Sequence, residues 1–326
     1  MTPADLDLVQ AWADGLAGPV TLGWVEGGGK QGLALEAFGR QLAALSPNIV
    51  FKLLDRPQGP APALAIGDRI FYQALPQGPE LAPFLEALAP GHPTDADPLA
   101  DRLAALSLPA SASLYIADPC PFCPTAVRQV LAMARATPYF QVTVIGATLF
   151  PDLAVKDDVR SVPTLILEGH TRWVGQVPQD EVVAHLLHPD PFRLSPTSLQ
   201  RLLEAGQAQQ VAGMMAQSGR LFPALIHLLA HPRWSVRLGA MVAAETLAET
   251  NRTLAGELQE PIWQAMARAD ATVQGDLLYV IGAIGGPETL ERLQVLVDGL
   301  GDEAVKEAAT EALERILKET QPKFLS

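Results

Sequence analysis

Apolar and polar residues alternate along the chain with two different periodicities. Up to about residue 190, short apolar runs typical of strands alternate with segments whose apolar positions recur at the spacing of amphipathic helices. Beyond residue 195 the strand pattern disappears and helical periodicity remains. Pro189, Pro191 and Pro196 fall between the two parts, so we expect a linker there. The pattern therefore predicts an α/β region followed by an all-α region.

The α/β region contains nearly the same order of predicted elements twice. The first copy has predicted helices at 5–15, 33–45 and 80–88, with strands at 20–25, 48–54, 63–66 and 70–74. The second has predicted helices at 99–106, 125–134, 150–157 and 178–187, with strands at 113–117, 141–145, 164–167 and 172–175. The segment Ala61–Ile66 aligns with Val162–Leu167, 101 positions further on, which predicts a domain-length internal duplication.

The chain has two cysteines, Cys120 and Cys123, and both lie between the predicted strand 113–117 and the predicted helix 125–134. This place favours redox chemistry, because a helix N-terminus offers free N–H groups and a partial positive charge that stabilise a thiolate. We predict that Cys120 is the nucleophile and that Cys123, one turn further on, resolves the mixed disulfide. The alternatives are a pair of buried, inert cysteines or half of a metal site. Zinc needs about four ligands and none of the histidines is paired with the cysteines, so we predict no metal.

Residues 111–187 resemble a thioredoxin-fold protein, through a strand, the motif Cys120–Cys123, a helix, and Val162–Thr164 at the start of a hairpin. In that family the proline of the second motif is cis and packs against both sulfurs, and the resemblance implies this role for Pro163. It also implies that the neighbouring Val162 and Thr164 lend backbone groups to an extended substrate segment.

The two residues between the cysteines, Pro121 and Phe122, are expected to take part in substrate binding. Phe122 would offer an apolar contact to the partner, and the alternative for this side chain is ordinary burial.

The tandem arrangement is similar to the N-terminal domain of the alkyl hydroperoxide reductase flavoprotein and to the tandem protein disulfide oxidoreductases of thermophiles. We therefore expect two tandem thioredoxin-like folds, a cysteine-free one over residues 1–95 and one with the C-P-F-C motif over residues 96–190. Leu114 stands where thioredoxin carries a buried acid, and the motif lacks the histidine of strongly oxidising members. The resemblance implies a reductant of moderate potential.

Residues 195–326 show a repeating helical pattern. Val236, Val273 and Val305 begin equivalent segments 37 and 32 positions apart, and a further helix pair at 197–218 precedes them. This spacing resembles HEAT repeats, stacked helix pairs whose concave face usually binds proteins. The alternative is a helical lid that stabilises the α/β region.

Charge and composition narrow the expected partners and location. A formal net charge of −13 over 326 residues argues against nucleic acid and anionic membranes as partners. No apolar run is long enough to span a membrane, and the first residues lack the features of a secretory signal, so we expect a cytoplasmic protein. In a reducing compartment such a cysteine pair is catalytic or redox-sensing.

The sequence as a whole predicts a thiol–disulfide oxidoreductase, acting as a protein disulfide reductase or an electron relay through the Cys120/Cys123 dithiol. The glycine run Gly27–Gly29 between the predicted strand 20–25 and the predicted helix 33–45 is interpreted as a flexible turn, because short glycine motifs are weak signals, so we expect no cofactor besides the redox-active disulfide. The predicted partners are a protein disulfide, a peroxiredoxin being one candidate, and an external flavin reductase or dithiol donor. The alternatives are a redox-sensing scaffold whose helical repeats recruit a client, and a holdase that works without its cysteines.

Overall fold

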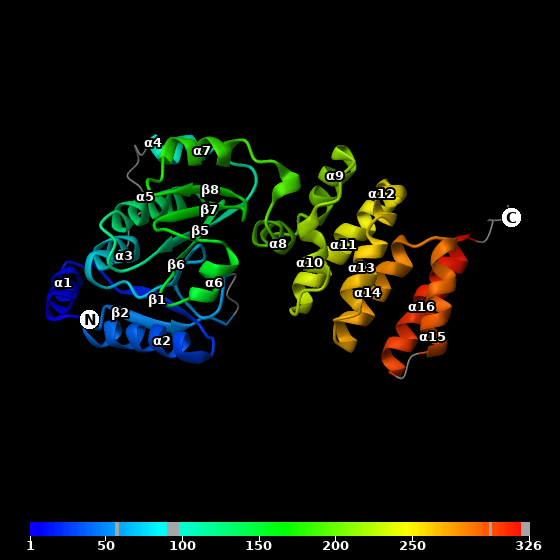
Figure 1. Ribbon diagram of the computed structural model, residues 1–326, viewed down its shortest axis with the longest axis horizontal. Helices are drawn as coiled ribbons and strands as arrows, with labels where there is room; N and C mark the ends of the chain where they lie inside the picture. Colours follow the sequence, from blue (N-terminus) through cyan, green and yellow to red (C-terminus); the bar gives the residue numbers. More distant parts are fainter. Residues whose placement is uncertain (56–58, 90–97, 300–301, 321–326) are drawn as a thin grey trace. The chain divides into compact units, whose positions relative to one another are not determined.

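The computed structural model describes residues 1–55, 59–89, 98–299 and 302–320. The chain divides into two compact units, Met1–Pro189 and Asp190–Ser326. Figure 1 shows strands together with helices in the first unit and helices in the second. The predicted order of an α/β region followed by a largely helical region is confirmed. The predicted boundary at residue 95 lies outside the described residues.

The described part of the first unit holds a single eight-stranded sheet with the order β2-β1-β3-β4-β6-β5-β7-β8. Its strands are β1 (Val20–Val25), β2 (Ile49–Leu53), β3 (Ala63–Ile66), β4 (Ile70–Gln73), β5 (Ala110–Ile116), β6 (Phe140–Gly146), β7 (Thr164–Leu167) and β8 (Thr171–Val174). The helices of this unit are α1 (Pro3–Asp14), α2 (Gly29–Ala44), α3 (Leu81–Leu88), α4 (Pro98–Leu103), α5 (Cys123–Ala136), α6 (Pro151–Lys156) and α7 (Gln179–Leu187), and a 3₁₀ turn, η1 (Gly78–Glu80), leads into α3.

Strand pairing follows the same plan in both halves of the sheet. β1 runs parallel to β2 and antiparallel to β3, which pairs antiparallel with β4. β5 likewise runs parallel to β6 and antiparallel to β7, which pairs antiparallel with β8. β4 and β6 pair in parallel and join the halves into one sheet. The same strand order therefore occurs twice in this sheet.

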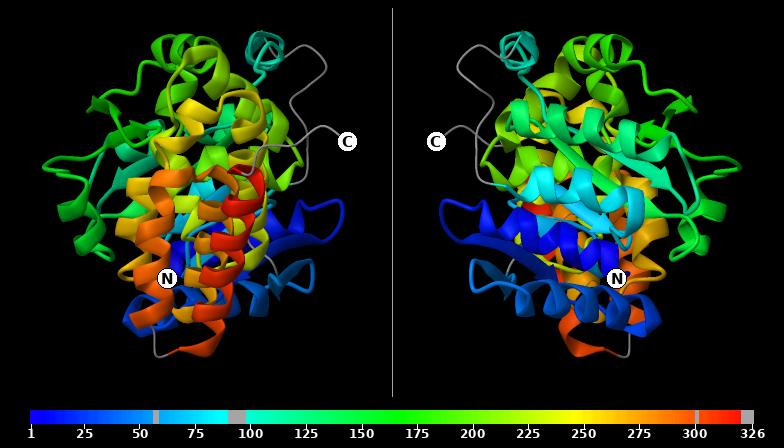
Figure 2. Two further views of the ribbon diagram at one scale, coloured as in Figure 1. Left: turned by 90° about the vertical axis from the view of Figure 1, so that its right-hand side faces the viewer. Right: turned by 90° about the vertical axis from the view of Figure 1, so that its left-hand side faces the viewer.

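Helices α2, α3 and α5 bury their apolar sides in one continuous core with the sheet. Phe38 of α2 and Phe84 of α3 meet edge to face with ring centroids 6.0 Å apart, an arrangement that aromatic pairs prefer. α3 and α5 lie side by side (Figure 1; Figure 2), so the closing helix of the first half contacts the helix that begins at Cys123.

Polar contacts between the same two helices add to this apolar packing. Arg128 of α5 forms a two-pronged ion pair with Glu86 of α3, with N–O distances of 2.8–3.1 Å. Arg135, two turns further along α5, donates to the carbonyl of Glu86 at 2.8 Å. The two halves are thus held together directly beside the cysteine-bearing helix.

The described part of the second unit is helical. Its helices are α8 (Pro196–Glu204), α9 (Ala208–Ser218), α10 (Pro223–Leu229), α11 (Trp234–Thr250), α12 (Arg252–Gly256), α13 (Gln259–Met266), α14 (Ala271–Ile284), α15 (Leu290–Gly299) and α16 (Glu303–Thr320), with the 3₁₀ turns η2 (Pro191–Arg193) and η3 (Pro287–Thr289). α10 packs on α11, α13 on α14 and α15 on α16, the last pair being orange to red in Figure 2. α9, α11, α14 and α16 also pack against one another in succession. None of the helices in the described part of the chain has the length and apolar character that a membrane span requires.

Candidate active site

The cysteine motif lies where β5 gives way to α5. β5 ends at Ile116, and Cys123 is the first residue of α5. Phe122, at the N-cap, makes no side-chain capping bond, and the N–H of Cys123 instead donates to the Sγ of Cys120 at 3.1 Å. The Cys120 sulfur thus takes the place of a capping oxygen at a helix N-terminus, where negative charge is stabilised.

Cys120 and Cys123 are joined by a disulfide, with their Cα atoms 5.6 Å apart. Cys123 is fully buried, whereas Cys120 is half-buried. A partner therefore reaches the sulfur of Cys120 before that of Cys123. Among the described residues, no group of three or more His, Cys, Asp or Glu side chains is placed to hold a metal ion.

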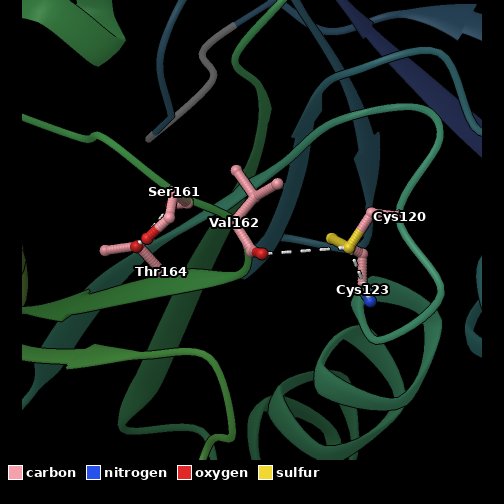
Figure 3. Close-up of a disulfide and its surroundings, with 5 residues drawn as sticks. All are labelled: Cys120, Cys123, Ser161, Val162 and Thr164. Atoms are coloured by element: carbon pink, nitrogen blue, oxygen red, sulfur yellow. Dashed lines mark hydrogen bonds between the residues drawn. A yellow bond between two sulfur atoms is a disulfide. The ribbon is translucent and has the colours of Figure 1, made fainter.

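The segment before β7 lies against this disulfide. The carbonyl oxygen of Val162 is 4.0 Å from the Sγ of Cys120, as Figure 3 shows, and the Val162–Pro163 peptide bond is cis. Thr164 is buried and its hydroxyl donates to the carbonyl of Ser161 at 2.7 Å, away from the sulfurs. The structure thus brings Cys120, Cys123 and Val162 together, with Thr164 closing the turn behind them.

The two residues between the cysteines are exposed. The side chain of Phe122 is 68% exposed, so the alternative of ordinary burial is wrong. An aromatic ring that remains in solvent beside a reactive sulfur is available for an apolar contact with a partner.

Glu80, which the sequence analysis did not single out as a site residue, lies at the end of η1, and η1 contacts α5. It is 8% exposed, and neither carboxylate oxygen has a hydrogen-bond partner among the described residues. Burial raises the pKa of Glu80 from its usual 4.5 to about 7; the positive charge of Arg128 opposes this rise and the negative charge of Asp118 adds to it. Glu80 therefore changes protonation near neutral pH, close to the residues that flank the cysteines.

One sequence signal points to Glu80 in retrospect. It shares one helical face with Phe84 and Leu88, so it is a lone acid on an apolar stripe. In the structure Tyr72 of β4 is buried as well, and its hydroxyl has no hydrogen-bond partner among the described residues. Burial, followed by the negative charges of Glu80 and Glu86, raises the pKa of Tyr72 well above its usual value.

A strand, a cysteine pair at the start of a helix and a prolyl segment opposite the sulfurs together define a thioredoxin-like domain. Residues 114–188 match the family model described as "Thioredoxin domain", so the predicted resemblance is confirmed for this part of the chain.

One solved structure extends the likeness in fold beyond these residues. The protein disulfide oxidoreductase from Aeropyrum pernix K1 superposes with a TM-score of 0.50 at 17% identity, over 60% of this chain and 95% of that one. The NTD_N/C domain of the alkyl hydroperoxide reductase AhpF from Enterococcus faecalis gives a TM-score of 0.48 at 20% identity, over 57% and 99% of the two chains. No curated protein matches the chain. At 17% identity, the likeness to the Aeropyrum pernix structure shows a shared fold.

Proposed function

We propose that this protein is a thiol–disulfide oxidoreductase that reduces disulfides in partner proteins or relays electrons to them. The observation that carries the proposal is the sulfur of Cys120, which is half-buried, receives the N–H of Cys123 at 3.1 Å and lies 4.0 Å from the carbonyl of Val162. These contacts combine a stabilised thiolate with an adjacent backbone edge.

The reaction would proceed through a mixed disulfide. The thiolate of reduced Cys120 attacks one sulfur of the partner's disulfide, and the other partner sulfur leaves as a thiolate. The thiolate of Cys123 then attacks the Sγ of Cys120 and releases the second partner sulfur. The partner gains two electrons, and the Cys120–Cys123 disulfide remains. An external flavin reductase or dithiol donor would supply two electrons to restore the dithiol.

Glu80 would accept and return the proton that this reaction requires. Cys123 is fully buried, so its thiol needs a nearby group that accepts a proton before it can attack Cys120. Glu80 is a buried carboxylate on η1, which packs on the helix that Cys123 begins. Its pKa of about 7 suits a group that takes up and returns a proton at neutral pH.

Substrate binding would use the exposed side of the disulfide. An extended segment of the partner lies along the backbone of Val162, with Pro163 and Thr164 shaping that edge, and Pro121 and Phe122 contact its apolar side chains. A protein disulfide, including that of a peroxiredoxin, fits these contacts. The acidic charge disfavours nucleic acid and membranes as partners and is compatible with a cytoplasmic location.

The rest of the chain would support this site. The repeated strand order favours two tandem thioredoxin-like folds, of which the cysteine-free one, residues 1–95, provides Glu80 to the second, residues 96–190. The stacked helix pairs from residue 195 to 326 favour a HEAT-like repeat domain that binds protein partners.

The proposal is tested by disulfide reduction with insulin as substrate and dithiothreitol as electron donor. Cys120→Ser should reduce the rate to that of dithiothreitol alone, because no nucleophile remains. Cys123→Ser, reduced and then freed of dithiothreitol before insulin is added, should accumulate a mixed disulfide between Cys120 and insulin, visible by mass spectrometry, because no second thiol of the protein remains to release it. Full activity in the Cys120→Ser variant would show that the proposal is wrong.

A redox-sensing scaffold is the second candidate, and it is favoured by an exposed apolar row on α11. Trp234, Leu238 and Val242 are spaced four residues apart on one side of this helix, and all three are exposed. A scaffold would show no turnover, and its binding of a client would survive Cys120→Ser.

A further inference from the structure

The segment that carries Val162 to the sulfur of Cys120 begins at the C-terminal end of α6. α6 ends at Lys156, and Asp157 and Asp158 follow before the chain turns towards Val162. Asp158 has a φ of 48°, a conformation that residues other than glycine seldom adopt, so other contacts must hold it in place.

Arg172 supplies two of those contacts from the edge strand β8. One guanidinium nitrogen donates to the carbonyl of Asp158 at 2.8 Å and the other donates to the carbonyl of Asp157 at 2.5 Å. Both bonds are charge-assisted, and a planar guanidinium suits such a forked contact better than an ammonium group does. Arg172 thereby fixes two successive peptide groups to the sheet.

A third contact holds the same turn from inside the molecule. The hydroxyl of Tyr115, a buried residue of β5, donates to the carboxylate of Asp157 at 2.6 Å and also lies 3.2 Å from the carbonyl of Leu153. β5 is the strand that leads to the cysteine motif. Tyr115 therefore connects the turn at Asp157 to β5, the strand that also positions the cysteines.

The other end of the segment is held separately. The hydroxyl of Thr164 donates to the carbonyl of Ser161 at 2.7 Å, and the N–H of Gly175 donates to the carbonyl of Pro163 at 2.8 Å. With both ends fixed, the backbone of Val162 has a defined place beside Cys120 (Figure 3).

We propose that Arg172 and Tyr115 are positioning residues for substrate binding, which hold residues 157–162 so that the Val162 backbone stays aligned with the sulfur of Cys120. This inference rests on the proposed function. Neither residue touches the reacting sulfurs, so the loss of either leaves the chemistry of the dithiol unchanged. It weakens the binding of disulfides that lie in a polypeptide, since these need the Val162 edge. A small disulfide has no backbone to pair and needs Cys120 alone.

The test compares two substrates in the full-length protein. The first is insulin, reduced with dithiothreitol as donor. The second is 5,5′-dithiobis(2-nitrobenzoate), reduced by the dithiol form of the protein. The variants are Arg172→Lys, which keeps the charge and removes the fork, and Tyr115→Phe, which keeps the ring and removes the hydroxyl. Arg102→Lys is the matched control, because Arg102 forms a surface ion pair with Asp180 between α4 and α7.

Arg172→Lys and Tyr115→Phe should each raise KM for insulin by about three- to tenfold, as expected for the loss of one or two hydrogen bonds, with kcat nearly unchanged. The rate with the small disulfide should stay at the wild-type value in every variant, and Arg102→Lys should match wild type on both substrates. Thermal melting verifies that each variant is folded.

Failure of the positioning role and failure of the proposed function would give different results. If folded Arg172→Lys and Tyr115→Phe keep the wild-type KM for insulin, the positioning role is wrong. An equal loss on both substrates also overturns it, because the residues then act on the dithiol itself. If wild type reduces neither substrate, the proposed function is wrong and the positioning role falls with it.

Discussion

The burial of Glu80 lowers the stability of the folded protein at neutral pH, although the proposed chemistry uses the raised pKa that this burial causes. A carboxyl group that is 8% exposed and has no hydrogen-bond partner among the described residues loses its hydration when the chain folds. Its pKa is raised, so the folded state binds the proton more tightly than the unfolded state does. Its contribution to stability is therefore fully present below the ordinary pKa of 4.5 and is lost as the pH rises through about 7.

Glu80→Gln should remove this pH dependence. The free energy of unfolding of wild type relative to Glu80→Gln should fall by about 2–3 kcal/mol between pH 4.5 and 8, because an amide does not ionise. Urea unfolding of the oxidised protein at several pH values measures this difference without interference from thiol titration. Glu86→Gln is the control: its carboxylate is exposed and paired with Arg128, and its loss should cost at most about 1 kcal/mol. A constant difference between wild type and Glu80→Gln across this range would contradict the expectation.

The residues of the site differ in how far the sequence could reveal them. Cys120, Cys123 and Val162 could be found because their evidence is local: a spacing of three at a strand–helix junction and a segment repeated in the first half. The role of Arg172 and the raised pKa of Glu80 could not, because both depend on contacts between elements that are separate in the sequence; the apolar stripe around Glu80 indicates an unusual acid but not its pKa. The burial of Glu80 arises where the halves meet, and the partners of Arg172 lie 14 and 15 positions earlier, across a turn.

At the scale of elements, the two halves of the sheet differ in the length of the loop that joins the first strand to the following helix. From the end of β5 the chain takes six residues to reach α5 at Cys123, whereas three residues join β1 to α2 at Gly29. The shorter loop packs closely: a Cβ atom on Gly27 would lie 2.7 Å from the backbone nitrogen of Pro62. Gly27 is therefore required by close packing of the backbone.

Gly32→Ala tests this packing. A Cβ atom on Gly32 of α2 would lie 1.9 Å from the carbonyl oxygen of Gly27, and a backbone atom cannot move aside as a flexible side chain can. In an unobstructed helix the change would stabilise by roughly 0.5–1 kcal/mol. Here we expect a loss of about 1–3 kcal/mol in the free energy of unfolding, measured by urea denaturation.

Gly28→Ala is the matched control for this substitution. A Cβ atom on Gly28 would meet nothing within 4 Å, and its φ is −79°, so the cost should stay below about 1 kcal/mol. Equal stability of the two variants would show that the loop adjusts freely.

Element positions could be predicted more closely than element ends. The strands predicted at 20–25, 63–66 and 164–167 have the observed bounds, because each is a compact apolar run between turn residues. β5 begins at Ala110, three residues before the predicted start, because its small residues carry little strand signal and pair with β6 instead. α5 begins at Cys123, two residues before the predicted start, which places the resolving cysteine inside the helix.

At the scale of the whole molecule, each unit has its own buried core, and in the second unit that core contains a charge. Arg237 of α11 is 2% exposed; it donates to Asp276 of α14 at 2.6 Å and to the carbonyls of His231 and Pro232 at 2.8 and 3.0 Å. The Arg237–Asp276 ion pair connects α11 to α14, the second helices of successive helix pairs. It therefore fixes the spacing between these two helices.

Arg237→Met should therefore destabilise the second unit selectively. Methionine fills much of the same volume but leaves Asp276 and two carbonyls without their donor, at a cost on the order of 3 kcal/mol. Hydrogen exchange resolves the effect by region: amides of α11 and α14 should exchange faster, while those of β5 and α5 keep wild-type protection. Arg292→Met, which removes an exposed pair with Glu260, should change protection in neither unit by more than about 1 kcal/mol. If β5 and α5 lose as much protection as α11, the two units unfold as one cooperative body, and the helical unit then contributes directly to the stability of the redox site.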